Sequence, residues 1–375
     1  MNSNKIKILQ TIRQGKIGGG ESHVLDLVEE LDKEKYESIV LSFTFGPMVD
    51  RMKEMGIKTY VIETEKPFNF TKWPEVEEIL LKEKIDIVHA HGTRANSNTF
   101  KSAKKLGIPI VYTVHGWSFH PDQNFFIKNL RIQGEKFLVN KANLTICVSD
   151  NNLHSAEENF KMARAKVIKY GINLNKYNPQ QNFLEVRKEL DINPSTVLVG
   201  YVVRMTKQKD PLTLVNAIAL IPKELDIKFL FVGDGELKND AIKLAKELNV
   251  DGKIIFLDFR QDVPNILNAI DIYCLPSLWE GLPIGMLEAM AMNKAVVVTS
   301  IDGAKEVIKT GENGMLVPVQ DPQKLAETIT LVAGDNDLRK KIGTNAGKTI
   351  LEDFSVSKMT RKIEKVYDEL VNSID

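Results

Sequence analysis

The first half of the chain alternates short runs of apolar, often β-branched residues with longer segments in which apolar positions recur every three or four residues. The short runs predict strands, and the longer segments predict amphipathic helices. We therefore expect strands at residues 6–12, 38–43, 59–62, 87–91 and 110–115, with helices within residues 18–32, 48–55, 73–84 and 95–106. Strands that are separated by helices in this way predict βαβ units and a parallel sheet.

A second cycle of strands and helices follows a stretch rich in Asn, Pro and Gln at residues 173–181, which is typical of a linker. Its strands are expected at residues 196–203, 228–232, 253–257, 270–275 and 295–298, its helices at 210–219 and 237–248, and a strongly patterned helix closes the chain at 356–373. The fold class is therefore α/β, with two Rossmann-like doubly wound domains. Because ligands bind such domains at the carboxyl ends of the strands, we expect the two domains to face each other across a cleft.

Length and charge narrow the class of protein. The chain has 375 residues, more than the roughly 100–200 residues of a typical single domain. Its net charge is 0, which gives no reason to expect a nucleic-acid partner, although residues 101–176 carry 12 Lys and Arg against 5 Asp and Glu. No apolar run approaches the roughly 20 residues of a membrane span. We expect a cytoplasmic protein, either free or held peripherally at the inner face of the plasma membrane.

The sequence offers no metal site. Cys147 and Cys274 both lie in apolar strand-like runs, which predicts buried free thiols and excludes a disulfide framework. His89 and His91 share one face of a predicted strand, but no carboxylate partner accompanies them. We therefore expect neither a metal nor a cofactor.

Two carboxylates in the second half point to a binding site. Glu280 and Glu288 bracket a turn formed by Gly281, Leu282 and Pro283, where an apolar strand gives way to a helix. Backbone N–H groups at a helix N-terminus favour an anion, whereas carboxylates there would repel it and instead accept hydrogen bonds from sugar hydroxyls. The pattern predicts a nucleotide-sugar site. The alternative is that Glu280 is an ordinary residue of a helix N-terminus and Glu288 a solvated one.

A cationic loop follows the first strand of the second domain. Arg204 can bind two phosphate oxygens with its guanidinium fork, and Lys209 adds a point charge. Together they would neutralise a nucleoside diphosphate leaving group. A solvated run of charges is the alternative for this loop.

The paired Glu280 and Glu288, together with Arg204 and Lys209 in an Arg-x-x-x-x-Lys spacing, resemble the signature of retaining glycosyltransferases with the GT-B fold, most closely family 4, the glycosyl transferases group 1. The resemblance implies that Glu280 contacts the donor sugar and Glu288 the ribose. It also implies that the final helix crosses back onto the first domain. We accordingly place an acceptor-side domain at residues 1–177 with 356–375, and a donor-binding domain at residues 178–355.

Further residues are assigned through the same resemblance. Gly19 and Gly20, in a glycine-rich turn that permits close backbone approach and positive φ, are similar to a donor-side element of the family. His115 stands in a His-Gly pair whose histidine contacts the donor sugar in the family, although a lone histidine is more often structural. Gly233 and Phe259 lie in loops after strands, where a nucleobase would bind. The chain departs from the family pattern at Asp210 and Asp258, both of which replace a usual glycine, and within residues 170–173.

The resemblance also implies the reaction. Enzymes of this family are thought to use front-face displacement, in which the departing diphosphate helps to deprotonate the acceptor hydroxyl, so no side chain need be a nucleophile. The substrates would be a UDP- or GDP-linked sugar and a hydroxyl of a glycan or lipid-linked acceptor in polysaccharide, lipopolysaccharide or other glycoconjugate synthesis. A sugar-nucleotide epimerase and a non-catalytic nucleotide-sugar-binding partner subunit are the alternatives.

Two further segments resemble functional elements. Residues 124–141 mix aromatic, aliphatic and basic side chains, which suits contact with an anionic membrane, but a core-packing helix with a solvated basic face is the preferred interpretation. Residues 343–349 resemble a P-loop, but only three residues separate the two glycines where that motif has four, and the segment is expected to be helical. We therefore do not expect an ATPase.

Overall fold

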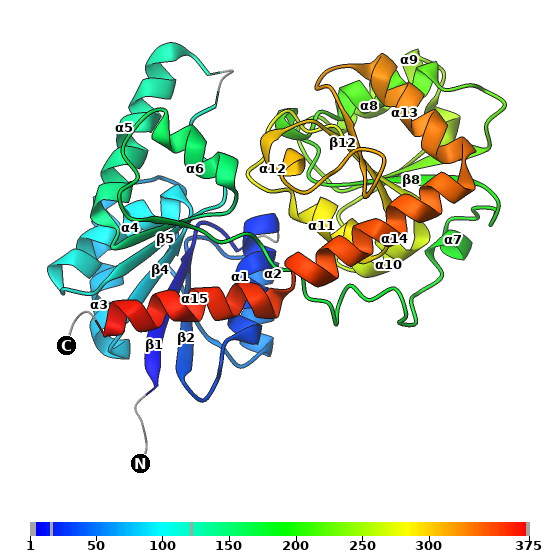
Figure 1. Ribbon diagram of the computed structural model, residues 1–375. Helices are drawn as coiled ribbons and strands as arrows, with labels where there is room; N and C mark the ends of the chain where they lie inside the picture. Colours follow the sequence, from blue (N-terminus) through cyan, green and yellow to red (C-terminus); the bar gives the residue numbers. More distant parts are fainter. Residues whose placement is uncertain (1–4, 16–17, 121–122, 373–375) are drawn as a thin grey trace. The chain divides into compact units, whose positions relative to one another are not determined.

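The computed structural model describes residues 5–15, 18–120 and 123–372. The chain folds into two compact units (Figure 1). Unit 1 comprises Met1–Gly171 and Val356–Asp375, and unit 2 comprises Ile172–Ser355.

Unit 1 is built on a seven-stranded parallel sheet with the order β3-β2-β1-β4-β5-β6-β7. The strands are β1 Ile6–Ile12, β2 Tyr36–Ser42, β3 Lys58–Val61, β4 Ile87–His91, β5 Ile110–Val114, β6 Leu144–Cys147 and β7 Ala165–Val167. The helices are α1 Gly19–Glu30, α2 Pro47–Glu54, α3 Trp73–Glu83, α4 Thr93–Lys105, α5 Phe125–Lys141, α6 Asp150–Glu157 and α15 Val356–Val371. The order reverses between β1 and β4, so their carboxyl ends lie at the point where such folds bind ligands.

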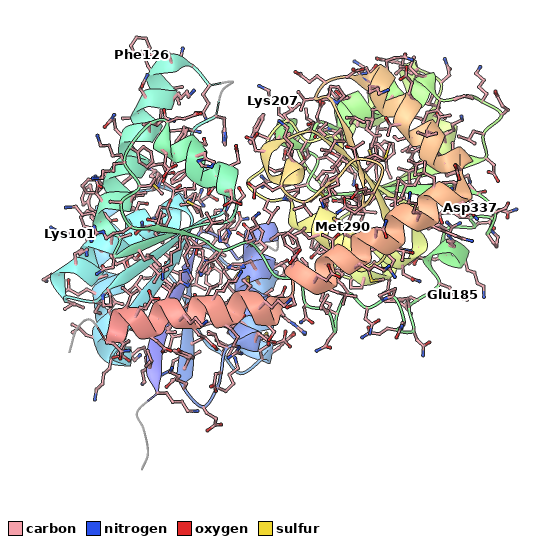
Figure 2. The ribbon with its side chains drawn as sticks, in the orientation of Figure 1. Lys101, Phe126, Glu185, Lys207, Met290 and Asp337 are labelled. Carbon is pink, nitrogen blue, oxygen red and sulfur yellow. The ribbon has the colours of Figure 1, made fainter. Side chains whose placement is uncertain are left out.

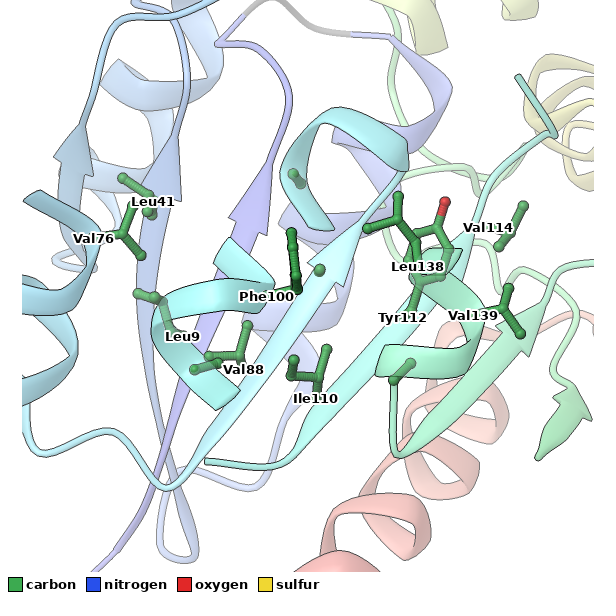
Figure 3. Packing of buried hydrophobic residues seen from close by; sticks show 14 of the residues in the cluster. Leu9, Leu41, Val76, Val88, Phe100, Ile110, Tyr112, Val114, Leu138 and Val139 are labelled. Carbon is green, nitrogen blue, oxygen red and sulfur yellow. The ribbon is translucent and has the colours of Figure 1, made fainter. Parts of the chain in front are cut away.

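The core of unit 1 has two layers, because successive residues of a strand point to opposite faces of the sheet. In β1, Leu9 packs with Phe100 of α4 and Leu138 of α5 on one face (Figure 3). The neighbouring Ile8 packs on the other face with Leu27 of α1 and with α15. Helices therefore cover both faces of the sheet.

The last helix, α15, completes unit 1, where Figure 1 shows it in red across one face of the sheet. Its buried Ile363 and Val366 join the layer that contains Ile8. Polar contacts reinforce this packing, since Asp368 Oδ1 accepts a hydrogen bond from the Tyr36 hydroxyl at 2.6 Å. The helix thus packs on the first unit although it follows the second in the sequence.

Unit 2 contains a six-stranded parallel sheet with the order β10-β9-β8-β11-β12-β13. The strands are β8 Val197–Val202, β9 Ile227–Val232, β10 Ile254–Leu257, β11 Ile272–Leu275, β12 Ala295–Thr299 and β13 Met315–Val317. The helices are α7 Val186–Glu189, α8 Pro211–Leu220, α9 Lys238–Glu247, α10 Val263–Ala269, α11 Ile284–Ala291, α12 Asp302–Lys305, α13 Pro322–Gly334 and α14 Asn336–Asp353. One layer of the core joins the sheet to α8, α9 and α13.

The two doubly wound parallel sheets predicted from the sequence are confirmed. Every predicted strand is present, and the sheets also contain β6, β7 and β13. The strand-like run that contains Cys147 is β6, whereas β7 and β13, with three residues each, were not predicted.

The first boundary between the units lies after Gly171 and not after residue 177. Ile172 forms a bridge with Ser355, and its N–H donates to the Phe354 carbonyl at 2.7 Å. Tyr177 donates a hydrogen bond to Glu288. These contacts hold the segment that follows Gly171 on unit 2, and a linker-like composition could not show which side the segment joins.

The segment that resembles a P-loop, residues 343–349, lies inside α14, as expected. Its glycines have a packing role. A Cβ at Gly343 would lie 2.2 Å from the Asn293 carbonyl oxygen, and one at Gly347 would lie 1.8 Å from the Asn293 side chain. The glycines therefore let α14 approach the turn after α11.

Candidate active site

The predicted site residues of unit 2 gather where its strands end. Glu280 lies in the loop between β11 and α11, and Lys209 in the loop after β8. The Lys209 ammonium donates to Oε1 of Glu280, which also accepts from the Ser277 hydroxyl at 2.9 Å. Gln208 donates to Oε2 at 3.3 Å. Glu280 is thus a largely buried carboxylate in a loop, oriented by its hydrogen bonds. The alternative interpretation, in which Glu280 is an ordinary residue of a helix N-terminus, is wrong.

Gln208 also ties the two loops together. The side-chain amide of Gln208 donates to the Trp279 carbonyl at 2.8 Å. The backbone carbonyl of Gln208 accepts a hydrogen bond from the Leu278 N–H at 2.8 Å. Trp279 is half-buried. Because each loop holds the other, the position of Lys209 relative to Glu280 is well defined.

Arg204 differs from Lys209 in its surroundings. Its side chain is exposed at the end of β8. Within the part of the chain that the structure describes, no carboxylate pairs with it. Its guanidinium can therefore bind an anion without first breaking an ion pair.

Gly233 supports the loop that carries Arg204. Gly233 has a φ of +132°, and a Cβ there would lie 2.1 Å from the Val203 carbonyl oxygen. Gly235 has the same role, since its Cβ would lie 2.2 Å from the Met205 carbonyl oxygen. Any side chain at Gly233 would push away the residues that flank Arg204.

The turn before α11 is also tightly packed. Pro283 is the N-cap residue of this helix, and Leu282 is buried. A Cβ on Gly303 of α12 would lie 2.0 Å from the Gly281 carbonyl oxygen. The turn of Gly281, Leu282 and Pro283 is therefore packed closely against α12. It presents the first N–H groups of α11 at the strand ends.

Glu288 lies in the second turn of α11, half-buried. Its Oε1 accepts a hydrogen bond from the Tyr177 hydroxyl at 2.6 Å. Burial raises the pKa of Glu288, while the hydrogen bond from Tyr177 and the charge of Lys176 lower it. The buried hydroxyl of Tyr273 has no hydrogen-bond partner among the described residues, and its pKa is raised by burial and by the charges of Glu288 and Glu280. The charges of Glu280 and Glu288 thus both raise the pKa of the same buried hydroxyl, that of Tyr273.

A third loop contributes Phe259, whose side chain is exposed after β10. Its N–H donates to Oδ2 of Asp234 at 3.1 Å. Lys238 donates to Asp234 at 2.9 Å and to Asp258 at 2.5 Å, and its hydrogen bond lowers the pKa of Asp234. The departure from the family pattern at Asp258 therefore adds an ion pair between Lys238, at the start of α9, and the exposed Asp258 after β10.

In unit 1 the glycine-rich turn leads directly into α1. Gly19 and Gly20 lie in the first turn of the helix, and Gly18 has an extended backbone with a φ of −151°. Residues 18–20 enter the helix without positive φ, although glycines would permit it. Gly20 lies close to His115, since a Cβ at Gly20 would lie 3.3 Å from the His115 ring.

His115 ends a directed chain of hydrogen bonds. The side-chain N–H of Gln10 donates to the Tyr367 hydroxyl at 3.1 Å. The side-chain oxygen of Gln10 therefore accepts a hydrogen bond from Nε2 of His91 at 2.9 Å. Neutral His91 then accepts at Nδ1 from Nε2 of His115 at 3.3 Å. Nδ1 of His115 accepts from the Tyr170 hydroxyl at 2.6 Å. Both ring nitrogens of His115 are therefore engaged within unit 1, and a sugar hydroxyl would have to replace one of these partners.

The surrounding histidines are held neutral. Burial lowers the pKa of His89, His91 and His115 well below the usual value, and that of His23 to about 4. His23 packs against His115 with ring centroids 5.3 Å apart, and neither of its ring nitrogens has a partner among the described residues. Within the described ranges, no group of three or more His, Cys, Asp or Glu is arranged to hold a metal ion.

Two family models match the chain, one in each half. The model of Glycosyltransferase Family 4 matches residues 17–176, and the model of Glycosyl transferases group 1 matches residues 182–349. The chain belongs to glycosyltransferase family 4. The family resemblance that the sequence motifs suggested is therefore confirmed, and this family 4 protein is a glycosyltransferase with the GT-B fold.

Curated relatives and solved structures cover nearly the whole enzyme. The UDP-Gal:alpha-D-GlcNAc-diphosphoundecaprenol alpha-1,3-galactosyltransferase of Escherichia coli is 28% identical over 383 residues, covering 98% of each chain. The N-acetyl-alpha-D-glucosaminyl L-malate synthase of Bacillus anthracis is 24% identical, covering 85% of this chain and 84% of the relative. Anabaena HepE, solved in complex with UDP-glucose, superimposes with a TM-score of 0.86 at 23% identity, over 97% of this chain and 99% of that structure.

Several residues at the site of this glycosyltransferase were not found by sequence reasoning. Ser277 and Gln208 orient Glu280, Tyr177 contacts Glu288, and Gly303 supports Gly281. Gly303 is a glycine in the short helix α12 that follows β12. Gln208 and Tyr177 are ordinary polar residues whose partners lie 72 and 111 positions away, and Ser277 lies only three positions from Glu280 but is equally ordinary.

Proposed function

We propose that the chain is a retaining, metal-independent glycosyltransferase that moves a sugar from a UDP-sugar to a hydroxyl of a lipid-linked or glycan acceptor in glycoconjugate synthesis. One observation carries the proposal. At the strand ends of unit 2, the Lys209–Glu280 pair lies in the loops that follow β8 and β11. Arg204, which pairs with no carboxylate among the described residues, follows β8 as well. These residues combine cations for a diphosphate with an oriented acceptor for sugar hydroxyls.

The leaving group would be handled by the two cations. Arg204 would bind the diphosphate with two parallel hydrogen bonds, and Lys209 would add its charge while still bonded to Glu280. Negative charge grows on the diphosphate as the glycosidic bond breaks, so these contacts strengthen in the transition state. The departing diphosphate would then take the proton of the acceptor hydroxyl, which attacks from the same face and leaves the anomeric configuration unchanged.

The carboxylates would orient the donor. Glu280, fixed by Ser277 and Gln208, would accept hydrogen bonds from hydroxyls of the sugar. Glu288 would accept from the ribose, and Phe259 and Gly233 would lie beside the base. We propose uridine as the base because the Escherichia coli relative is named for UDP-Gal and the Anabaena structure holds UDP-glucose. GDP is the alternative nucleotide.

The acceptor proposal rests on the first turns of α5. Phe125, Phe126 and Leu130 are 73%, 80% and 75% exposed, and Figure 2 shows Phe126 pointing away from the helix. Ile127, Lys128 and Arg131 lie among them, and we call this set of six residues the α5 surface. The helix packs into the core only farther along, through Ile132, Leu138 and Val139. The later turns of α5 therefore pack into the core, as the preferred interpretation expected, whereas its first turns do not.

An exposed aromatic and basic helix start suits the surface of an anionic membrane. None of the helices among the described residues has both the length and the apolar character to cross a bilayer. We therefore propose peripheral contact through the α5 surface. An acceptor linked to diphosphoundecaprenol, such as the one in the name of the Escherichia coli relative, would be reached there, whereas an acceptor such as the L-malate in the name of the Bacillus anthracis relative needs no membrane.

The test is a transfer assay in two stages. Thermal unfolding with UDP, GDP, ADP and CMP would first identify the nucleotide, since a ligand at 100 times its Kd stabilises by about 2.7 kcal/mol. UDP-sugars would then be supplied with a sugar-diphosphoundecaprenol acceptor in vesicles, with L-malate, and with no acceptor, in the presence of EDTA. We expect UDP release with the lipid-linked acceptor and an α-linked product from an α-linked donor by NMR. Interconversion of UDP-sugars without acceptor would instead establish an epimerase. Stabilisation by a nucleotide without transfer to any acceptor would favour a non-catalytic nucleotide-sugar-binding subunit, and the absence of any nucleotide effect would contradict a donor site altogether.

A further inference from the structure

We infer that Tyr177 is a positioning residue for the donor nucleotide: it fixes the carboxylate of Glu288 and so determines how strongly unit 2 discriminates in favour of a ribose with both hydroxyls. This inference rests on the proposed function and adds a residue to its donor site. Tyr177 itself would not touch the nucleotide. It would act through the orientation and ionisation of Glu288.

The geometry of the contact is specific. Tyr177 lies only a few residues after the boundary between the units, and its side chain is 3% exposed. Its hydroxyl donates to Oε1 of Glu288 at 2.6 Å, a length typical of a strong hydrogen bond to an ionised carboxylate. The Lys176 ammonium lies 5.1 Å from the centre of the Tyr177 ring. The phenol is thus held in place by burial and by a neighbouring cation.

The hydrogen bond from Tyr177 uses only one of the acceptor positions of the Glu288 carboxylate. An ionised carboxylate has two oxygens and about four acceptor positions. With Oε1 engaged by Tyr177, the carboxylate plane is fixed, and its remaining positions can accept from the 2′ and 3′ hydroxyls of a ribose. A carboxylate free to rotate would lose conformational entropy on binding, and a fixed one avoids that cost.

Tyr177 also favours the ionised form of Glu288. Burial raises the pKa of this carboxyl, and the hydrogen bond from Tyr177 opposes that effect. Removing the hydroxyl would raise the pKa further. The carboxyl would then be a weaker acceptor for ribose hydroxyls over a wider range of pH.

The deciding variant is Tyr177→Phe, which keeps the buried ring and removes only the hydroxyl. Binding of UDP, 2′-deoxy-UDP and 3′-deoxy-UDP would be measured by calorimetry for the wild type and the variant. We expect the wild type to prefer UDP over each deoxy analogue by about tenfold, the worth of a hydrogen bond to a charged group. In Tyr177→Phe the affinity for UDP should fall several-fold and the preference should shrink to about twofold.

A merely structural role for Tyr177 would weaken all three nucleotides equally and leave the preference unchanged, which would overturn the inference. In the variant, the pH below which UDP affinity declines should also move upward. The matched control is Tyr60→Phe, which removes another tyrosine–glutamate hydrogen bond, to Glu83 in unit 1, and should change neither quantity. A wild type that binds UDP without any ribose preference would contradict the inference alone, whereas a wild type that binds no nucleotide would contradict the proposed function as well.

Discussion

Lys209 and Glu280 form an ion pair in unit 2, with side chains that are only 22% and 10% exposed. The pair joins the loop after β8 to the loop after β11. Each partner compensates the charge of the other in surroundings with little water. Removal of one therefore leaves the other charge uncompensated, and the two residues should act as one unit.

A double-mutant cycle tests this coupling. Lys209→Ala and Glu280→Gln should each lower kcat/KM by about 10²- to 10³-fold, because each loses a contact made in the transition state. The double variant should be far less impaired than the product of the single effects, since the first substitution already breaks the pair. The kcat/KM of all four proteins would be obtained from initial rates of UDP release with a saturating acceptor. Additive effects would mean that the two side chains work independently.

Arg204 should be required for turnover and not for folding, because its side chain is exposed and pairs with no carboxylate in the described part of the chain. Arg204→Ala should lower kcat by about 10²-fold with an unchanged thermal midpoint. Arg204→Lys should recover only part of the loss, because an ammonium lacks the planar fork. The exposed Lys207 in the same loop gives the control, and Lys207→Ala should retain most activity. Near-normal turnover of Arg204→Ala would refute its role at the leaving group.

Gly233 should be irreplaceable for a steric reason. In Gly233→Ala the new Cβ would lie 2.1 Å from the Val203 carbonyl oxygen at a φ of +132°. We expect a loss of about 2 kcal/mol or more, which corresponds to a fall in Tm on the order of 5 °C for a unit of this size. The control is Gly252→Ala, where a Cβ meets nothing within 4 Å. Equal Tm values for the two variants would show that the loop after β8 can move aside.

His23 should make folding depend on pH. Burial lowers its pKa to about 4 in the folded state, whereas an unfolded histidine has a pKa of about 6.5. Below pH 6.5 the unfolded chain therefore binds a proton that the folded chain does not, and the free energy of unfolding decreases as the pH falls. In His23→Phe this contribution disappears. Between pH 6.5 and 5 the variant should lose about 1.5 kcal/mol less than the wild type in urea unfolding. Parallel losses would show that His23 is protonated in the fold.

The α5 surface should bind anionic vesicles. We expect the wild type to co-sediment with vesicles that contain phosphatidylglycerol, and salt to weaken the binding by screening the basic residues. Phe126→Ser combined with Leu130→Ser should abolish most of it, because apolar side chains no longer enter the interface. Leu81→Ser provides the control, since Leu81 is an exposed leucine on α3 of the same unit. Binding that is indifferent to lipid charge would contradict the proposal.

The alternation of short apolar runs with amphipathic segments of helical period was sufficient to predict two doubly wound sheets. The spacing of Arg204 and Lys209 and of Glu280 and Glu288 was sufficient to identify the family. These features are local, since each depends only on neighbours along the chain. The same locality explains the misses: β7 and β13 have only three residues each, too few to stand out as apolar runs, and a glycine-rich composition at Gly18 did not reveal whether φ is positive.

Tertiary structure alone decided which residues meet. Lys209 pairs with Glu280, Tyr177 with Glu288, and His91 with His115, across separations of 71, 111 and 24 positions. It also decided that the residues just after Gly171 belong to unit 2 and that the first turns of α5 remain exposed. Such partnerships arise because a parallel sheet brings the carboxyl ends of distant strands to one edge, and no pattern along the chain records which side chains will be neighbours there.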